Sequence, residues 1–102
     1  MGAKIHTGDT PDFEHTMRDD DDVIVDISSP ITLTMFLLKP DGTVLTKTAS
    51  LVGDGTDGLM HYQVLTADLD AQGDWSRQAY VKTAGGEWTG KLFKFTVHRK
   101  LG

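Results

Sequence analysis

Apolar and polar residues alternate with a period of two along much of the chain, and this pattern predicts β-strands. Ile31, Leu33, Met35 and Leu37 share one face of a run that ends at Pro40-Asp41-Gly42, a sequence typical of a tight turn. A similar run begins near Phe13. The pattern predicts about seven strands, over residues 13–18, 23–27, 31–38, 43–52, 60–64, 75–82 and 93–97.

These strands and their short turns indicate an all-β fold, an immunoglobulin-like antiparallel β-sandwich of about seven strands. We expect an N-terminal arm over residues 1–12, the sandwich over 13–98 and a C-terminal tail over 99–102. The arm is expected to be irregular and held mainly by another subunit. Residues 66–74 are expected to form one short helical turn, in which Leu69 closes an end of the sandwich.

The length, cysteine content and net charge of the chain limit the classes of partner that it is expected to bind. The chain has 102 residues, the size of one domain. It contains no cysteine, which excludes disulfides and fits a reducing cytoplasm. Its net charge of −5 disfavours nucleic acid as a partner. The N-terminus does not read as a signal peptide, and no run approaches the roughly 20 apolar residues that cross a bilayer, so we expect no membrane partner.

The chain contains serines and histidines, but none of them lies in a recognised catalytic or metal-binding motif. None of the four serines lies in a Gly-x-Ser-x-Gly elbow. The four histidines lack the spacing typical of metal ligands; they are His6, His15, His61 and His98. We therefore expect no enzymatic activity, no cofactor and no metal site.

Four consecutive aspartates, Asp19 to Asp22, predict a solvent-exposed turn, because adjacent carboxylates repel one another and resist burial. Clustered carboxylates also suit calcium, which is the alternative interpretation. The run lacks the alternating spacing and the distant glutamate of a calcium loop, so the turn is preferred.

Some hydrophobic side chains are candidates for contact with a partner protein. Phe36 and Leu38 make the second face of their strand apolar near its end, which predicts a covered surface. Trp88 does not fit the register of its neighbours, which indicates an exposed aromatic contact or a cover over the open face of the sheet. The candidate interface residues are Trp88, Tyr80, Phe36, Leu38 and Ile5. Arg77 falls on the inward face of its strand, where we expect its stem on the core and its head at the rim.

Five short segments follow one another along the chain: GDTPDF at 8–13, VDIS at 25–28, LKPDGT at 38–43, DGLMHY at 57–62 and DLDAQGDW at 68–75. Their order and spacing resemble the immunoglobulin-like domain of tailed-bacteriophage virion proteins, of the type at the N-terminus of baseplate upper proteins. The resemblance spans residues 8 to about 97 and carries over no catalytic residue.

This resemblance implies a non-enzymatic bacteriophage virion structural protein that acts through protein–protein contacts. Because no further module follows the sandwich, a stand-alone adaptor, tail-decorating or capsid-cementing subunit is the expected form. The implied partners are capsid, neck or tail proteins, and the chain itself in a symmetric ring or shell. The implied location is the virion, assembled in the host cytoplasm.

Two alternatives remain open at this point. A carbohydrate- or ligand-binding β-sandwich would use Trp88 and Tyr80 as stacking platforms for sugar rings. An adhesion or accessory module of a bacterial surface protein would be a monomer exported as part of a larger precursor.

Overall fold

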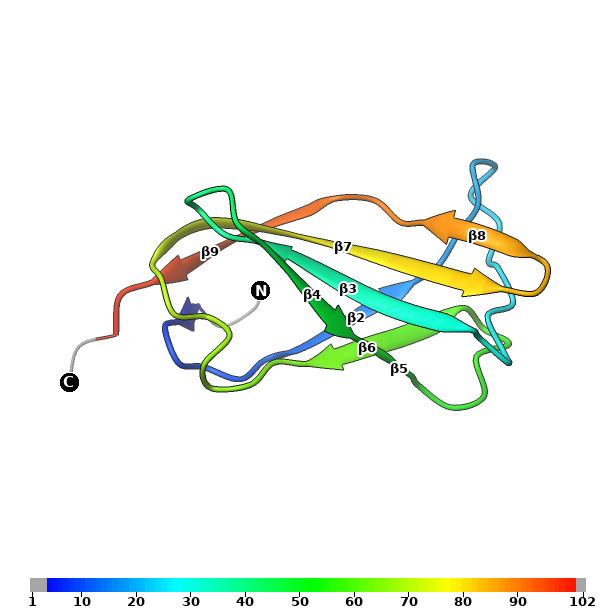
Figure 1. The fold of residues 1–102 in the computed structure, drawn as a ribbon, viewed down its shortest axis with the longest axis horizontal. Helices are drawn as coiled ribbons and strands as arrows, with labels where there is room; N and C mark the ends of the chain where they lie inside the picture. Colours follow the sequence, from blue (N-terminus) through cyan, green and yellow to red (C-terminus); the bar gives the residue numbers. More distant parts are fainter. Residues whose placement is uncertain (1–3, 101–102) are drawn as a thin grey trace.

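The computed structural model describes residues 4–100, which form nine β-strands and no helix (Figure 1). The strands are β1 (Ile5–His6), β2 (Asp12–Thr16), β3 (Thr32–Leu38), β4 (Val44–Thr48), β5 (Ser50–Leu51), β6 (Leu59–Gln63), β7 (Gly73–Thr83), β8 (Gly86–Thr89) and β9 (Phe93–His98). The expected all-β sandwich is confirmed. None of the described residues forms a helix long and apolar enough to cross a membrane.

The strands form two sheets in a molecule of 46 × 25 × 25 Å. The larger sheet has the order β1-β9-β7-β3-β4, with β8 also paired to β7, and the smaller sheet has the order β2-β6-β5. β7 is the longest strand and pairs with β3, β8 and β9 (Figure 1). Among the named strands, β1 and β9 run parallel and the other pairs are antiparallel.

The chain passes from one sheet to the other at Ala49, which is 5% exposed. Its N–H donates to the carbonyl of Leu33 at 3.0 Å, and the next residue, Ser50, already pairs with His61 of the smaller sheet. The single strand expected over residues 43–52 is therefore two strands.

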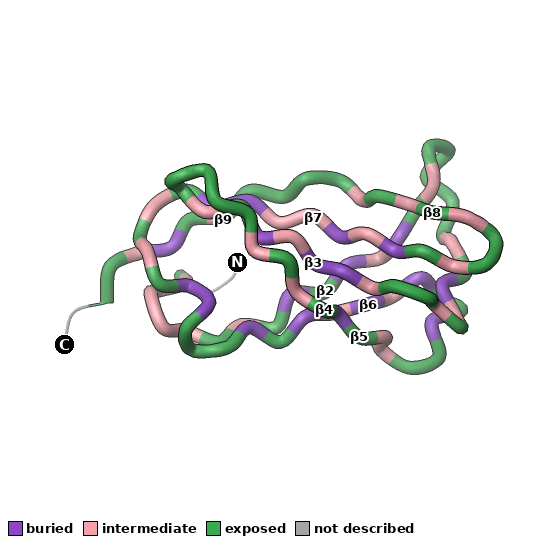
Figure 2. The backbone as a smooth tube through the Cα atoms, viewed as in Figure 1, coloured by how far each residue is buried: buried purple, intermediate pink, exposed green. Residues whose placement is uncertain are grey.

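The core lies between the inward faces of the two sheets, and buried residues alternate with more exposed ones along β2 and β6 (Figure 2). Trp75 is 1% exposed, and its indole N–H donates to the carbonyl of Ala71 at 2.9 Å. The buried hydrophobic residues are Phe13, Met17, Ile27, Met35, Leu37, Ala49, Met60, Tyr62, Val64, Leu69, Trp75, Ala79, Val81 and Val97.

The strand expected over residues 23–27 is not formed. Only one isolated bridge, between Arg18 and Ile24, occurs there, and Val23 and Ile24 are 57% and 45% exposed. The aspartate turn explains the difference, because the Asp19 carboxylate accepts the N–H groups of Asp21 and Val23 and folds the segment back on itself. The expectation of a turn at Asp19 to Asp22 is confirmed.

The expected irregular arm over residues 1–12 is also partly wrong. Ile5 and His6 form β1 and pair with Val97 and His98 of β9, so the described part of the arm is held by its own chain. Asp12 already belongs to β2. Residues 1–3, like 101–102 of the expected tail, lie outside the described residues.

The expected helical turn over residues 66–74 is replaced by a hydrogen-bonded turn, in which the Asp68 N–H donates to the carbonyl of Leu65 at 2.9 Å. The Asp68 carboxylate also accepts the Leu65 N–H, at 2.9 Å, so the backbone and the side chain of Asp68 close the same turn. Leu69 is 0% exposed, as expected for a residue that closes the end of the sandwich.

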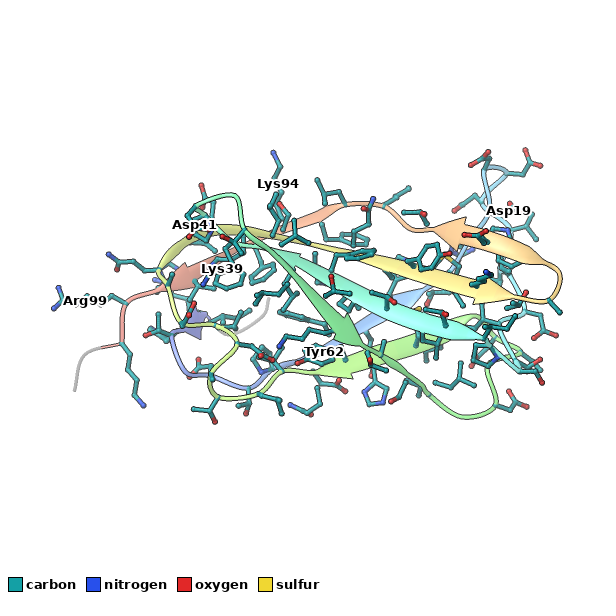
Figure 3. The ribbon with its side chains drawn as sticks, in the orientation of Figure 1. Asp19, Lys39, Asp41, Tyr62, Lys94 and Arg99 are labelled. Atoms are coloured by element: carbon teal, nitrogen blue, oxygen red, sulfur yellow. The ribbon has the colours of Figure 1, made fainter. Side chains whose placement is uncertain are left out.

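Asp68 is the centre of a buried polar network that joins both sheets. The hydroxyl of Tyr62, on β6 (labelled in Figure 3), donates to one carboxylate oxygen, and Lys47 Nζ of β4 lies 2.9 Å from the other. Burial alone would raise the pKa of Asp68, but the hydrogen bonds from Tyr62, Leu65 and Lys47 hold it below its ordinary value. Burial, and then the bond to Asp68, raise the pKa of Tyr62.

Tyr62→Phe should lower the free energy of unfolding by about 1–3 kcal/mol, because it leaves a buried carboxylate with one donor fewer. Urea denaturation measures the change. Tyr80→Phe is the matched control: it also removes a hydroxyl bonded to a carboxylate, Glu87, but on the exposed surface, and it should stay within about 0.5 kcal/mol of the wild type. Equal losses in the two variants would contradict a special role for the Asp68 network.

Candidate functional site

Two histidines from opposite ends of the chain lie side by side where β1 pairs with β9. The parallel register places His6 opposite His98, and their ring centroids are 5.8 Å apart. The pairing continues past β1, where the Thr7 N–H donates to the carbonyl of His98 at 2.9 Å. Adjacent strands lie about 4.8 Å apart, so the backbone itself fixes the proximity of the two rings.

A carboxylate stands beside this pair. After β1 the chain turns at Gly8, whose φ of +84° suits glycine, and Asp9 then folds back onto His6. One Asp9 carboxylate oxygen accepts the backbone N–H of His6 at 2.8 Å and lies 3.8 Å from Nδ1 of the same residue. Both side chains are more than two-fifths exposed. We call His6, Asp9 and His98 the imidazole cluster.

A third histidine, His61, lies on the outer face of the smaller sheet. Its Nδ1 is 2.7 Å from a carboxylate oxygen of Asp12, and Glu14 is its partner in the β2–β6 register. A carboxylate at Nδ1 fixes the orientation of the ring and directs Nε2 away from Asp12.

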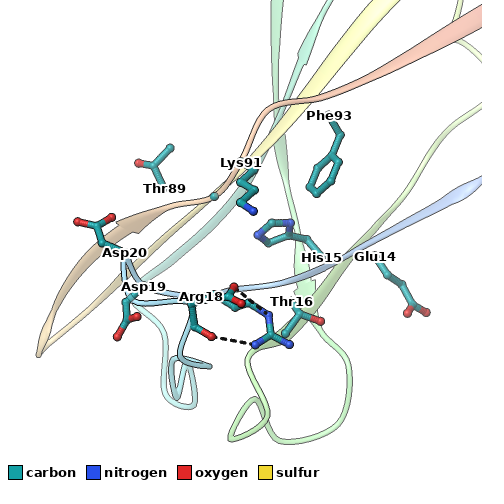
Figure 4. A pocket seen from close by; sticks show the side chains of 11 residues that line it. Glu14, His15, Thr16, Arg18, Asp19, Asp20, Thr89, Lys91 and Phe93 are labelled. Atoms are coloured by element: carbon teal, nitrogen blue, oxygen red, sulfur yellow. Dashed lines mark hydrogen bonds and ion pairs between the residues drawn. The ribbon is translucent and has the colours of Figure 1, made fainter.

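The fourth histidine, His15, lies beneath a cleft of about 650 Å³ between β2 and the β8–β9 connection (Figure 4). His15 is 8% exposed, and its Nε2 has no hydrogen-bond partner in the structure. Gly90 packs against this nitrogen so closely that a Cβ there would lie 2.4 Å from Nε2. Burial, and then the nearby Arg77 guanidinium, lower the pKa of His15, so the ring is held neutral.

The walls of this cleft carry charges of both signs. Arg18 donates to the carbonyl of Asp22 at 3.1 Å and lies 3.9 Å from its carboxylate, as the dashed lines in Figure 4 show. Lys91 lines the same cleft together with Asp19 and Asp20. The mixture favours no single class of ligand.

Arg77 holds β7 against the edge of the smaller sheet. Its guanidinium lies 5.0 Å from the ring centroids of both Phe13 and Phe93, and it donates to the carbonyl of Glu14 at 3.1 Å. Burial lowers its pKa. These contacts assign Arg77 a structural role in which its half-buried charge rests between two aromatic faces.

Of the expected interface residues, three come together and two do not. Phe36, Leu38 and Tyr80 share the outer face of the larger sheet, with the Phe36 and Tyr80 rings 6.5 Å apart. Trp88 pairs with Val81 on the inward face and packs against the core, as does Ile5 from β1. Trp88 and Tyr80 therefore lie on opposite faces of one sheet and cannot form the expected stacking platform.

The proximity of His6 and His98 was missed because it depends on topology rather than on spacing. No local motif links residues at the two ends of a chain; only the parallel pairing of β1 with β9 brings them together. Within residues 4–100, no three histidine, aspartate or glutamate side chains converge tightly enough to hold a metal ion as they stand.

No protein-family model matches the chain, and no curated protein matches it. Among solved structures, the chain is similar to CopC from Methylosinus trichosporium OB3b, with a TM-score of 0.61 and 16% sequence identity. The likeness covers 99% of this chain and 89% of CopC. At this identity it shows a shared β-sandwich fold.

This finding corrects the expected function. The structural neighbour is a copper-binding protein, which contradicts the expectation of a bacteriophage virion subunit. The comparisons support the β-sandwich and give no support to a phage, virion or capsid assignment.

Stability should fall as the pH drops below about 6.5, because the unfolded chain then takes up a proton at His15 that the folded protein resists. Since the folded pKa is the lower one, this contribution is complete above 6.5 and is lost as the pH falls toward the folded value. Urea midpoints measured from pH 7 to pH 5 should fall in the wild type and fall less in His15→Leu. An unchanged acid sensitivity in His15→Leu would contradict the assignment.

Proposed function

We propose that this protein binds copper(II) through the imidazole cluster of His6, Asp9 and His98. The observation that carries the proposal is the pair of imidazole rings with centroids 5.8 Å apart. Metal–nitrogen bonds to histidine are about 2 Å long, so a single ion can lie between two rings at this separation after side-chain rotation. The shared fold with CopC, a copper-binding protein, supports the choice of metal.

The donor set suits copper chemically. Neutral imidazole nitrogens are good ligands for Cu²⁺, which binds mixed nitrogen and oxygen sites more tightly than the other divalent first-row ions. Asp9 supplies an anionic oxygen on the same side of β1. Because the side chains of His6 and Asp9 are well exposed, an ion can reach the cluster without opening the core.

The imidazole cluster would hold copper as an open site, in which the protein supplies only part of the coordination, rather than as a closed one. The Asp9 oxygen is already bonded to the His6 N–H at 2.8 Å, and within residues 4–100 no set of three ligands is preformed. The two imidazoles would therefore hold the ion, with Asp9 and water completing its coordination. Such a site binds exchangeably, in contrast to a structural metal site in which all ligands are preorganised.

The test is a Cu²⁺ titration of the protein purified without a histidine tag, followed by calorimetry and by electron paramagnetic resonance. The wild type should bind one equivalent with nitrogen hyperfine coupling from two imidazoles. His6→Ala and His98→Ala should each weaken binding roughly tenfold or more, since even the loss of an outer partner of a ligand costs that much.

His61→Ala is the matched control. It removes an imidazole that also has a carboxylate neighbour, but on the outer face of the other sheet. Its copper affinity should equal that of the wild type. Unchanged binding in the His6→Ala, His98→Ala double variant, or a loss confined to His61→Ala, would overturn the proposal.

A further inference from the structure

The two strands that carry the imidazole cluster also carry an apolar pair on their other face. In the β1–β9 register Ile5 lies opposite Val97, and the next position pairs the two histidines. Successive side chains of a strand point to opposite faces, so the apolar pair faces the core while the imidazoles face outward. Val97 is 1% exposed, and Ile5 packs against the core from the edge of the sheet.

Few contacts hold β1 in place. It has two residues and lies at the edge of the larger sheet, where it pairs with β9. Just after it, the Thr7 N–H donates to the carbonyl of His98 at 2.9 Å and the Gly8 N–H donates to the carbonyl of Leu69 at 3.0 Å. With so short a pairing, burial of the Ile5 side chain contributes a substantial part of the free energy that keeps β1 on β9.

The two candidate imidazole ligands meet only while β1 is paired with β9. Their ring centroids are 5.8 Å apart because the register sets His6 opposite His98. If β1 is released, His98 stays on β9, whereas His6 leaves with the arm, and one imidazole remains at the site. The affinity of a ligand that binds one form of a protein falls in proportion to the population of that form.

We propose that Ile5 is a positioning residue for copper binding, which sets the copper affinity of His6 and His98 by holding β1 against β9. This inference rests on the proposed copper site and adds a residue that does not touch the metal. Linkage makes the effect reciprocal, because copper bound across β1 and β9 stabilises the docked strand. Copper occupancy and the attachment of the N-terminal strand are therefore coupled.

The first test compares Ile5→Ala with the wild type by copper calorimetry. The substitution removes buried apolar surface but no metal ligand, so the Cu²⁺ affinity should fall at least about threefold. At saturating copper the electron paramagnetic resonance spectrum should still show two imidazole nitrogens, because both ligands remain. Ile5→Val keeps the β-branched shape and most of the buried surface, and it should restore an affinity close to that of the wild type.

Leu51→Ala is the matched control. Leu51 belongs to β5, which is also a strand of two residues at the edge of its sheet, and its side chain is likewise partly buried against the core. Leu51→Ala should lower the urea midpoint, as Ile5→Ala does, and leave the copper affinity unchanged. The comparison separates the positioning of a ligand from a general loss of stability.

Trypsin gives a second readout, which can be taken without copper. Lys4 is exposed, but cleavage of its bond to Ile5 requires an unpaired segment, so the rate follows the released population of β1. The Lys91–Leu92 bond, in the exposed connection between β8 and β9, is the internal reference. Relative to this bond, cleavage after Lys4 should be faster in Ile5→Ala than in the wild type, and saturating copper should slow it in the wild type.

The copper site and the role of Ile5 fail in different ways. A wild type that binds no copper, or binding that survives in the His6→Ala, His98→Ala double variant, rejects the copper site and this inference with it. Wild-type binding that needs both histidines, together with an unchanged affinity in Ile5→Ala, leaves the copper site in place and overturns the role of Ile5. An equal loss of affinity in Leu51→Ala overturns that role as well.

Discussion

Burial of one carboxylate, Asp68, constrains the rest of this structure. A charge that is 5% exposed is stable only if its oxygens are hydrogen-bonded. Tyr62 of β6 and Leu65 of the turn that follows donate to it, and Lys47 reaches it from β4. Lys47 comes from the larger sheet and Tyr62 from the smaller one. The two sheets are thus held in one relative position, the loop that carries Leu69 into the core is fixed, and both outer faces keep a defined shape.

The imidazole cluster lies at one edge of this frame, because β1 is the edge strand of the larger sheet. Its formation depends on the pairing of β1 with β9, which brings the two ends of the chain together. His6 and His98 alternate with the inward-facing Ile5 and Val97, so both imidazoles lie on the outer face of that sheet.

Much of the fold could be predicted from the sequence, because the alternation of apolar and polar residues within a strand can be recognised from neighbouring residues alone. Leu33, Met35 and Leu37 face inward, as the pattern indicates, whereas Ile31, just before β3 begins, is 64% exposed. The prediction failed at Val23 and Ile24, whose apolar side chains are exposed beside a turn that aspartate hydrogen bonds shape. It also failed where distant strands meet: the pairing of His6 with His98 and the ion pair of Lys47 with Asp68 depend on sheet topology, which no local pattern encodes.

The parallel pairing of β1 with β9 has a mechanical consequence. Pulling on the flanks of two antiparallel strands peels their bonds apart one after another, but parallel strands drawn from their outer ends slide past each other and share the tension. Here that load falls on two register pairs, Ile5 with Val97 and His6 with His98, and on the hydrogen bond from the Thr7 N–H to the carbonyl of His98. Under tension this short β1–β9 pairing would break first and release β1, while β7 would stay paired with β3, β8 and β9.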